Sequence, residues 1–488
     1  MKIIINRLPN KFYSNYKQVI IRFLDLGEER TSALITKVLE MDESDADKTL
    51  MYTLREFSKR HRNLTHKFIK HYSKAMEIVT NTLTEPEQIS MVKKLLIGSY
   101  FSMEYSISSA AFFNPSIVES PDQTGLSEGS KRIIVSFRAT GEGHISSIVF
   151  QTGVINHRGE LEFEKAGYHV DSAEVTKRHI YDKKSFHAKL HEMGVDELVI
   201  KPVMDSLTDK FIYGELLKSV YEYLANNSNL EEEVQRSVKQ IIWLADSHYT
   251  IHFSRDTHIS ERVIFPTSYT ERKGIEDARF VKFTDDDGET TYYATYSAYD
   301  GYAALQKLIV TKDFYTFEIK PLHGDGTQNK NLALFPRKIK GKYAMLSRID
   351  GISSYIAFSD NINVWPAPVK IQEPKYSWEF IQIGNCGAPI ETSEGWLVIT
   401  HGVGPMRQYS LGATLLDLDD PTKEIGRLRD PLLVPNDEER EGYVPNVVYS
   451  CGSIIHNDEL IVPYGLSDTG SGFMTVNVRK LLNKILNN

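Results

Sequence analysis

Cysteine is nearly absent from this sequence, with Cys386 and Cys451 as its two copies in 488 residues. Two cysteines exclude a disulfide framework and a cysteine-rich metal site, and we expect both to be small buried residues in strands. No apolar run approaches the roughly 18 residues of a membrane helix, and the first residues lack the apolar core of a signal peptide. We therefore expect no membrane partner and a cytoplasmic location.

An excess of positive charge is also missing, since the net charge is -8 and the pI is near 6.0. The chain offers no general basic field, so nucleic-acid binding is not expected and any anion site must be local. The sequence has no Walker-type glycine loop, no HExxH and no GxSxG elbow. We expect neither a cofactor nor a metal, and we interpret the acidic run at 285–288 as a hairpin turn.

Two segments have helical periodicity. Apolar residues return every three or four positions from about residue 29 to 98, after a short strand candidate at 18–26. The same spacing recurs at 183–245 inside an otherwise β-rich sequence. We predict a helical N-terminal region over residues 1–110, which is a candidate surface for homo-oligomer formation, and a helical insertion at 183–245.

From residue 111 to 488 the pattern is mainly β. Alternating apolar runs that end in Ser, Thr or Asp and an acidic turn recur around Ser254, Thr311, Ser359 and Asp417, with a weaker copy before the insertion. The spacing of roughly 50 to 60 residues is near the roughly 40 to 50 residues of a propeller blade. Four or five such units favour a β-propeller, whose axis gathers loops from every blade; a pair of β-sandwiches is the alternative.

The densest cluster of charged residues is KGIEDAR at 273–279, directly before a predicted apolar strand. Glu276 and Asp277 are adjacent carboxylates, Arg279 follows them, and Gly274 gives the entrance conformational freedom. A charged surface turn is the structural alternative for such a cluster. In a propeller, however, a strand entrance faces the axis, where distant polar residues can converge. The other polar residues at strand entrances are Asn114, Arg138, Lys330, Asn331, Arg348, His401, Glu441 and Asp468.

Aromatic residues are abundant, with 26 Tyr and 22 Phe. Tyr292, Tyr293, Tyr296 and Tyr299 follow the carboxylate pair, while Trp378 and Tyr443 lie in other predicted loops. Rings beside carboxylates suit a carbohydrate ligand, because sugar C–H faces stack on rings while hydroxyls bond to acids and amides. The alternative is that these tyrosines are simply β-favouring strand residues.

At these residues the sequence resembles the mannoside phosphorylases and β-mannosidases of glycoside hydrolase family 130. The resemblance runs in order from about residue 112 to 468. It is carried by FNPS, FRATGEG, GIEDAR, NKNLALFPRKIKGKYAMLSR, IGNCGAPIETSEGWLVITHGVG, LGATLLDLDDPTKEIGR, GYVPNVVYSCG and VPYGLSD.

The resemblance implies a five-bladed β-propeller over 111–488 and a division of labour at its axis. It makes Asp277 the single general acid, acting through the 3-hydroxyl of the bound mannose, while inorganic phosphate attacks the anomeric carbon with inversion. The product is α-mannose 1-phosphate, so phosphate is a co-substrate and an oligosaccharide is the partner. Lys330, Arg348 and His401 match the phosphate site. The sugar-contacting set is Asn114, Arg138, Glu276, Asn331, Glu441, Tyr443 and Asp468.

Two departures from the family pattern stand out. Ala278 replaces the usual proline after the acid, and the helical segments exceed those of compact members. Two alternatives to phosphorolysis stay open. Some relatives are β-1,2-mannosidases, which need a carboxylate base to activate water, and Glu441 and Glu379 are the candidates. A propeller that binds glycans or proteins without cleaving them would instead scatter Asp277, Arg348 and His401 over the outer surface.

Overall fold

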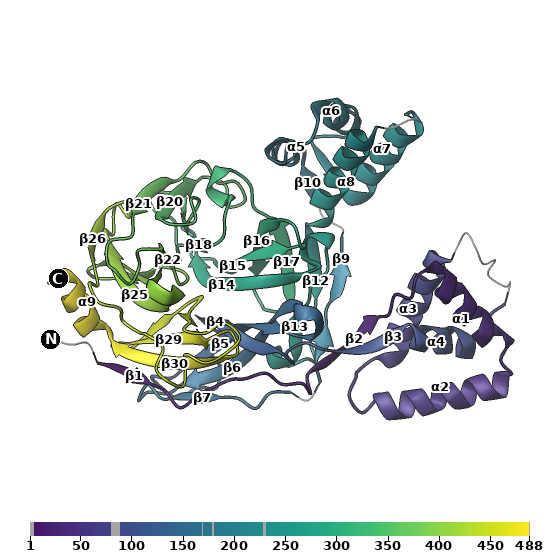
Figure 1. Cartoon of the computed structure of the whole chain (residues 1–488), viewed down its shortest axis with the longest axis horizontal. Helices are drawn as coiled ribbons and strands as arrows, with labels where there is room; N and C mark the ends of the chain where they lie inside the picture. The colour runs from purple at the N-terminus through teal and green to yellow at the C-terminus, as the bar shows by residue number, and fades with distance from the viewer. Residues whose placement is uncertain (1–3, 80–87, 168, 178–179, 228–230, 488) are drawn as a thin grey trace.

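The computed structural model describes residues 4–79, 88–167, 169–177, 180–227 and 231–487. It is mainly β, with helices near the N-terminus and a separate helical lobe (Figure 1). No helix among these residues is long and apolar enough to cross a bilayer. The mainly β fold with N-terminal helices is therefore the one that the sequence predicts.

Five sheets of four or more strands make up the β-rich part of the described chain. Figure 1 shows them side by side around a common centre. The first sheet has the order β4 (Ala111–Glu119), β5 (Lys131–Thr140), β6 (Ser146–Ile155), β13 (Arg262–Ile264), β8 (Asp171–Ser172), with β7 (Leu161–Phe163) also on β6. The second has the order β14 (Gly274–Thr284), β15 (Thr290–Tyr299), β16 (Ala304–Thr311), β17 (Thr316–Pro321), β12 (Tyr249–His252), β9 (Glu174–Thr176).

The remaining three sheets follow in chain order, and the last of them also takes up the first strand of the protein. The third contains β18 (Ala333–Leu334), β19 (Tyr343–Ser347), β20 (Ser354–Ser359) and β21 (Val369–Gln372). The fourth contains β22 (Gln382–Asn385), β24 (Gly395–Val403), β25 (Tyr409–Leu416) and β26 (Glu424–Arg427), with β23 (Ile390–Thr392) on β24. The fifth contains β1 (Ile5–Arg7), β30 (Gly470–Asn477), β29 (Glu459–Leu466) and β27 (Val448–Tyr449), with β28 (Ile454–His456) on β29, and helix α9 (Val478–Leu486) follows it.

Hydrogen bonds join the first sheet to the last. The Phe112 amide donates to the Thr469 carbonyl at 3.1 Å, and the Ser471 hydroxyl donates to the Phe112 carbonyl at 2.9 Å. The Cys451 amide donates to the Pro115 carbonyl at 2.9 Å. β1 pairs antiparallel with β30, and the following Phe12 bonds Ser471 of the last sheet through its amide and stacks on Phe112 of the first sheet, so the N-terminal segment helps to hold these two sheets together.

The repeat that the sequence suggests is only partly a repeat of sheets. Thr311 and Ser359 end β16 and β20, and Asp417 directly follows β25, so these three positions are equivalent in successive sheets. Ser254 is different, because it follows β12, which lies between β17 and β9 in the same sheet as β16. The interpretation of the Ser254 copy as a separate unit is therefore wrong. A polar turn after a strand does not by itself mark a new sheet.

Both faces of the strands after the acidic stretch are buried. Tyr292, Ala294, Tyr296 and Ala298 of β15 alternate into one core cluster, while Tyr293 packs on the opposite side against the core of the third sheet. Tyr292 and Tyr296 are therefore core residues and not a sugar platform, as the β-favouring alternative predicts. The acidic run at 285–288 is the turn of the β14–β15 hairpin.

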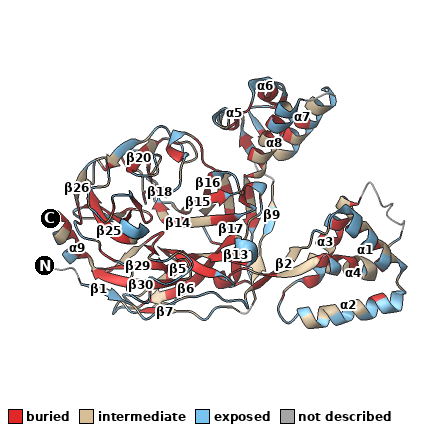
Figure 2. Cartoon of the chain, viewed as in Figure 1, coloured by how far each residue is buried: buried red, intermediate tan, exposed pale blue. Residues whose placement is uncertain are grey.

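Helices α1 to α8 form two outlying units. The N-terminal unit contains α1 (Glu28–Glu40), α2 (Glu43–Phe57), α3 (Leu64–Ile78) and α4 (Met91–Tyr100), joined to the ring by the paired strands β2 (Val19–Phe23) and β3 (Ser102–Ser106). The second unit, the insertion lobe, contains α5 (Lys183–Glu192), α6 (Glu197–Asp205), α7 (Tyr213–Ala225), α8 (Glu232–Asp246) and the pair β10 (Ile180–Asp182) and β11 (Lys210–Ile212). Each unit has its own apolar core, and Figure 2 shows buried residues in red on the inner sides of these helices.

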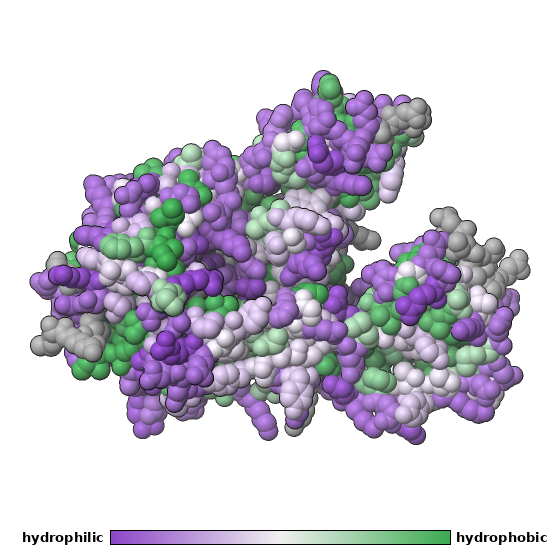
Figure 3. Space-filling view, in the orientation of Figure 1, coloured by the Kyte–Doolittle hydropathy of each residue, from purple (hydrophilic) through white to green (hydrophobic). Residues whose placement is uncertain are grey.

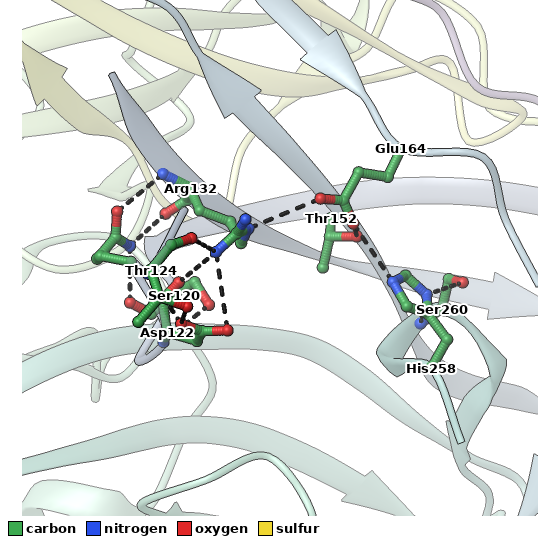
Figure 4. A network of polar contacts seen from close by, with 9 residues as sticks. Ser120, Asp122, Thr124, Arg132, Thr152, Glu164, His258 and Ser260 are labelled. Atoms are coloured by element: carbon green, nitrogen blue, oxygen red, sulfur yellow. Dashed lines mark hydrogen bonds and ion pairs between the residues drawn. The ribbon is translucent and has the colours of Figure 1, made fainter. Parts of the chain in front are cut away.

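A polar network on the first sheet ties β5 and β6 to the segment before β13 (Figure 4). Thr152 donates to the Glu164 carboxylate at 2.5 Å, and His258 Nε2 lies 3.3 Å from the same group. Arg132 Nε lies 3.7 Å from the other oxygen of Glu164. All these groups pair within the fold, so we assign this network a structural role.

Candidate active site

The predicted site residues come together from several sheets at backbone irregularities. The β14–β15 register shifts between Glu276 and Arg279, and the β4–β5 register shifts between Phe113 and Ser116. These β-bulges place Asp277 and Asn114 in left-handed backbone, with φ of 54° and 48°. Asn and Asp tolerate that conformation better than other L-residues, and such residues cluster at functional sites. Asn114 Nδ2 donates to Asp277 Oδ1 at 2.7 Å.

An arginine and a lysine hold the second carboxylate. Arg138 of β5 donates to Glu276 Oε1 at 2.9 Å, and its other terminal nitrogen lies 3.5 Å from Asp277 Oδ1. Lys330 Nζ donates to Glu276 Oε2 at 2.6 Å. Lys330 therefore pairs with Glu276, and the carboxylate partly balances the positive charge of the lysine.

Asp277 is held as a carboxylate in the unliganded protein. Burial acts to raise its pKa, but the charges of Arg138 and Arg279 and the Asn114 hydrogen bond outweigh that effect and keep the pKa below its ordinary value of 3.8. A general acid must carry a proton when it acts, so the cations around Asp277 have to be neutralised before the reaction.

Arg279 lies at the centre of the cluster. It is only 4% exposed, donates to the Asp277 carbonyl at 2.9 Å and donates to the Tyr449 hydroxyl at 2.6 Å. Its Nε is buried and has no hydrogen-bond partner among the described residues. None of the ion pairs found in this part of the chain involves Arg279, so its positive charge has no adjacent carboxylate side chain.

Arg348 and His401 form the neighbouring pair, with Arg348 donating to His401 Nε2 at 3.0 Å. Since arginine can only donate, Nε2 accepts, and the proton of the ring is on Nδ1, 3.2 Å from the Asn385 carbonyl. Burial, and then the charges of Arg348 and Arg279, lower the His401 pKa well below 6.5. His401 is therefore a neutral residue that accepts from Arg348 and positions its guanidinium.

Two predicted sugar ligands are placed differently from each other. Asn331, with φ of 75°, exchanges hydrogen bonds with Asn385: its Nδ2 donates to the Asn385 carbonyl at 2.8 Å, and its Oδ1 accepts from the Asn385 amide at 2.9 Å. It links the third and fourth sheets. Asp468, with φ of 55°, lies in the field of Asp277 and Arg138, and burial followed by the Asp277 charge raises its pKa to about 6.

Glu441 and Tyr443 lie outside the hydrogen-bonded cluster. Both are exposed, Tyr443 at 72%, and the Tyr443 ring stacks on His144 with 5.5 Å between ring centroids. Glu379 is fully buried, where it accepts from the Lys375 amide at 2.8 Å and from Arg427 at 3.0 Å. Neither glutamate is bonded to the Asp277 cluster in the described residues.

Sequence reasoning missed three members of the cluster. Tyr449, Asn385 and Cys386 contact Arg279, Asn331 and His401, and Cys386 Sγ lies 3.7 Å from His401 Nδ1. All three stand inside stretches that carry the family resemblance, which is the signal that could have identified them. Cys386 and Cys451 are buried as predicted, but both lie just outside strands.

A separate group of possible metal ligands occurs in the insertion lobe. The ligand atoms of His187, His191 and Glu197 all lie within 4.8 Å of one another. His191 Nε2 is 2.9 Å from Glu197, so the group is also satisfied as an ion pair. It shares no residue with the Asp277 cluster.

Figure 3 shows hydrophilic residues gathered around the hollow in the middle of the ring.

Comparison with known proteins identifies the family. The glycoside hydrolase family 130 model, described as β-1,4-mannooligosaccharide phosphorylase, matches residues 227–487. The chain is 39% identical over 218 residues to the 1,2-β-oligomannan phosphorylase of Thermoanaerobacter sp. (strain X514), covering 43% of this chain and 71% of that protein. It is 34% identical over 270 residues to the β-1,2-mannobiose phosphorylase of the same strain, covering 52% of this chain and 82% of that protein.

Among solved structures, the β-1,2-mannobiose phosphorylase of Listeria innocua in complex with β-1,2-mannobiose aligns with a TM-score of 0.46 and 22% identity, over 79% of this chain and 94% of that chain. The assignment rests on the sequence comparisons, since the family model spans more than half of the residues. This chain therefore belongs to glycoside hydrolase family 130, the family of the β-mannoside phosphorylases.

Proposed function

We propose that this protein is an inverting phosphorylase that removes the terminal sugar of a β-mannoside. A phosphate oxygen attacks the anomeric carbon, the glycosidic C–O bond breaks, and the proton of Asp277 reaches the leaving oxygen through the 3-hydroxyl of the mannose. The products are α-mannose 1-phosphate and a mannoside shortened by one unit. Asn114, Arg138 and Asp468 are the proposed sugar contacts nearest to the acid.

The observation that carries this proposal is the surplus of positive charge around Arg279 and Arg348. Arg279 is buried, Arg348 is partly buried, and the Nε atoms of both lack a partner among the described residues. A buried guanidinium without a salt-bridge partner is costly, and a bidentate guanidinium matches phosphate geometry. We infer that phosphate binds between these two arginines, with neutral His401 holding Arg348 in place.

Phosphate binding would also explain how Asp277 becomes protonated before it acts as the acid. Arg279 is one of the two main charges that keep Asp277 ionised. A phosphate dianion at Arg279 offsets that charge, so the Asp277 pKa should rise only when the co-substrate is bound. The acid is then protonated in the complex that reacts. The pH profile of kcat at saturating phosphate, compared with that of kcat/KM at low phosphate, measures this rise.

The hydrolytic alternative has weaker support. Glu379 already accepts from Arg427 and two backbone amides, and Glu441 is exposed outside the cluster. A water-activating base must be within reach of the anomeric carbon opposite the acid. The non-catalytic alternative expects scattered residues. Against it, Asp277, Arg279, Tyr449, His401 and Arg348 follow one another in contact.

We further propose that the five sheets are the blades of a propeller over residues 111–488, with residues 1–110 as a separate helical region. Helix α2 exposes Met51 at 57% and Tyr52 at 60%, which supports self-association through that region. Light scattering of the full chain and of a Met51→Lys/Tyr52→Lys variant tests this. A monomeric wild-type protein would rule out the association.

The experiment for the main proposal compares β-mannobioses with and without phosphate. Two relatives are named for β-1,2-linked substrates and a third, from Ruminococcus albus, for β-1,4-mannooligosaccharides, so β-1,2-mannobiose is tested first and β-1,4-mannobiose second. We expect α-mannose 1-phosphate only when phosphate is present. Equal release of free mannose in both conditions would establish hydrolysis instead.

A further inference from the structure

A large cleft lies under the insertion lobe, and its lining includes Gln328, two residues before the Lys330 that bonds Glu276. It has a volume of about 1090 Å³ and runs between α5 and α8 on one side and the β15–β16 and β17–β18 connections on the other. Figure 1 shows α8 on the side of the lobe that is nearest to β16 and β17.

The cleft and the active site share one end of the second sheet. Glu276 of β14 is directly opposite Ser297 of β15, and Ser297 is directly opposite Gln306 of β16. Residues that are directly opposite on neighbouring strands have their side chains on the same face of the sheet. Two strand spacings, about 10 Å, therefore separate the active-site carboxylate from the cleft. A short chain of sugar units can span that distance.

Gln306 offers an unused hydrogen-bond donor at the wall of the cleft. The side chain is only 4% exposed, and the Ser297 hydroxyl donates to its Oε1 at 2.8 Å. Its Nε2 has no partner among the described residues. A buried amide donor is costly to leave unpaired, so this position favours a polar ligand that brings an acceptor.

The charges of the cleft point to a neutral ligand. Its lining carries three cations, Lys189, Arg236 and Lys239, and four acids, Glu192, Asp246, Asp300 and Asp325, so the two signs nearly balance. Trp243 is partly buried, and Tyr269 is 53% exposed. Aromatic faces beside balanced polar groups suit a polyhydroxylated chain better than an anion.

We propose that this cleft binds the part of a β-mannooligosaccharide that extends beyond the cleaved bond, so that the insertion lobe sets a preference for longer chains. The proposal rests on the proposed function, because it assigns the substrate of the same site. It adds a chain-length specificity with Tyr269 and Gln306 as its determinants. Neither residue belongs to the Asp277 cluster.

The test compares substrates of two to five mannose units in the β-1,2 and β-1,4 series. We expect the wild-type kcat/KM to rise with chain length. Tyr269→Ala should raise KM for the pentasaccharide about three- to tenfold, the range of one aromatic contact, and leave mannobiose unchanged. Tyr269→Phe keeps the ring and should restore the wild-type preference. Tyr221→Ala removes a similarly exposed tyrosine, at 61%, on α7 outside the cleft and should change nothing.

The outcomes separate the two proposals. A kcat/KM that is independent of chain length, or a Tyr269→Ala variant that retains the preference, overturns the role of the cleft while phosphorolysis of mannobiose stands. Absence of turnover on every β-mannoside overturns the proposed function and the cleft's substrate with it. A parallel loss on mannobiose and pentasaccharide in Tyr269→Ala would show a general effect on the site and would also overturn the chain-length role.

Discussion

Two buried charged clusters stand in the same short stretch of sequence, one around Glu271 and the other around Asp277. Glu271 is fully buried and ends η3 (Tyr269–Glu271). Its carboxylate accepts from Lys307 Nζ at 2.7 Å, the Tyr296 hydroxyl at 2.6 Å and the Tyr249 hydroxyl at 2.7 Å. The Asp277 cluster is also buried, but Arg279 and Arg348 each retain a donor without a partner in the described chain.

The difference separates a structural ion pair from a candidate binding site. Around Glu271 one negative charge meets one positive charge, and the remaining lone pairs accept from hydroxyls and from the Thr267 amide. Around Asp277, Arg138 pairs with Glu276 and Asp277, but Arg279 and Arg348 have no salt-bridge partner in the described chain. Burial and perturbed pKa values occur in both clusters, so neither property alone marks function. The arginines without a carboxylate partner are what distinguish the Asp277 cluster as a candidate binding site.

The largest expected effect comes from removing the proposed acid. Asp277→Asn should lower phosphorolysis of a β-mannobiose about a thousandfold, the middle of the range for general acid catalysis. The activity loss should be smaller on an aryl β-mannoside, whose leaving group needs no proton. Product release measured by coupled detection of mannose 1-phosphate gives both rates. Near-normal turnover of mannobiose would remove Asp277 from this role.

The second prediction concerns stability and tests the buried Glu271–Lys307 pair. Lys307→Met leaves the Glu271 carboxylate buried without its cation, so the free energy of unfolding should fall by about 3 to 5 kcal/mol. The double variant Glu271→Gln/Lys307→Met removes both charges and should recover part of that loss. Urea unfolding of the three proteins measures it. Equal stability of Lys307→Met and wild type would contradict the pair's structural role.

The corresponding substitution at Arg348 should weaken phosphate binding more than it lowers the free energy of unfolding. Arg348→Met should raise KM for phosphate about ten- to a hundredfold, the value of hydrogen bonds to a charged group. Its unfolding free energy should fall less than that of Lys307→Met, because no carboxylate side chain loses a partner and only the neutral His401 loses a hydrogen bond. Phosphate should raise the melting temperature of the wild type more than that of the variant.

Arg337→Met provides the matched control for Arg348→Met. Arg337 pairs with Glu391 at 2.7 Å, and its side chain is 40% exposed. We expect no change in KM for phosphate and at most a small loss of stability, since exposed ion pairs contribute little. A similar rise in KM in both variants would show that the effect is not local to the proposed phosphate site.

Much of the fold was predictable from local pattern. The helical periods at 29–98 and 183–245 and the β alternation after residue 111 are local signals, and the elements follow them in the described residues. The Ser254 anchor failed because a polar turn also follows β12, which lies between β17 and β9 in the same sheet as β16, so such a turn does not mark a new sheet. The pairing of β1 with β30 is a contact between opposite ends of the chain, and no local pattern reports it.

The sequence predicts that most of these residues converge, but it does not predict their hydrogen-bond partners. Asn114, Asp277, Asn331 and Asp468 are all Asn or Asp in left-handed backbone, which their residue type favours. Their hydrogen-bond partners were not predicted: Lys330 donates to Glu276, and Asn331 donates to Asn385. The neutral state of His401 depends on burial and on two arginines from other strands. These are properties of three-dimensional packing that residue type alone does not determine.

The smallest expected effect concerns Asp468, which feels the Asp277 charge without a hydrogen bond to it in the described contacts. Burial, and then Asp277, raises the pKa of Asp468 from 3.8 to about 6 in the folded protein. The folded state therefore binds this proton more tightly than the unfolded state. The resulting stabilisation is present below pH 4 and is lost as the pH rises through about 6.

Asp468→Asn keeps a neutral side chain at every pH, so it should be more stable than wild type at pH 7.5 and equal to it at pH 4. We expect a difference of about 1 kcal/mol at pH 7.5, because partial solvent exposure screens the charge. Urea unfolding at both pH values measures it. Asp350→Asn is the control of opposite sign, since the pKa of Asp350 is lowered, and it should lose stability at pH 7.5. A difference between Asp468→Asn and wild type that is the same at both pH values would mean that packing, and not the charge of Asp277, governs this position.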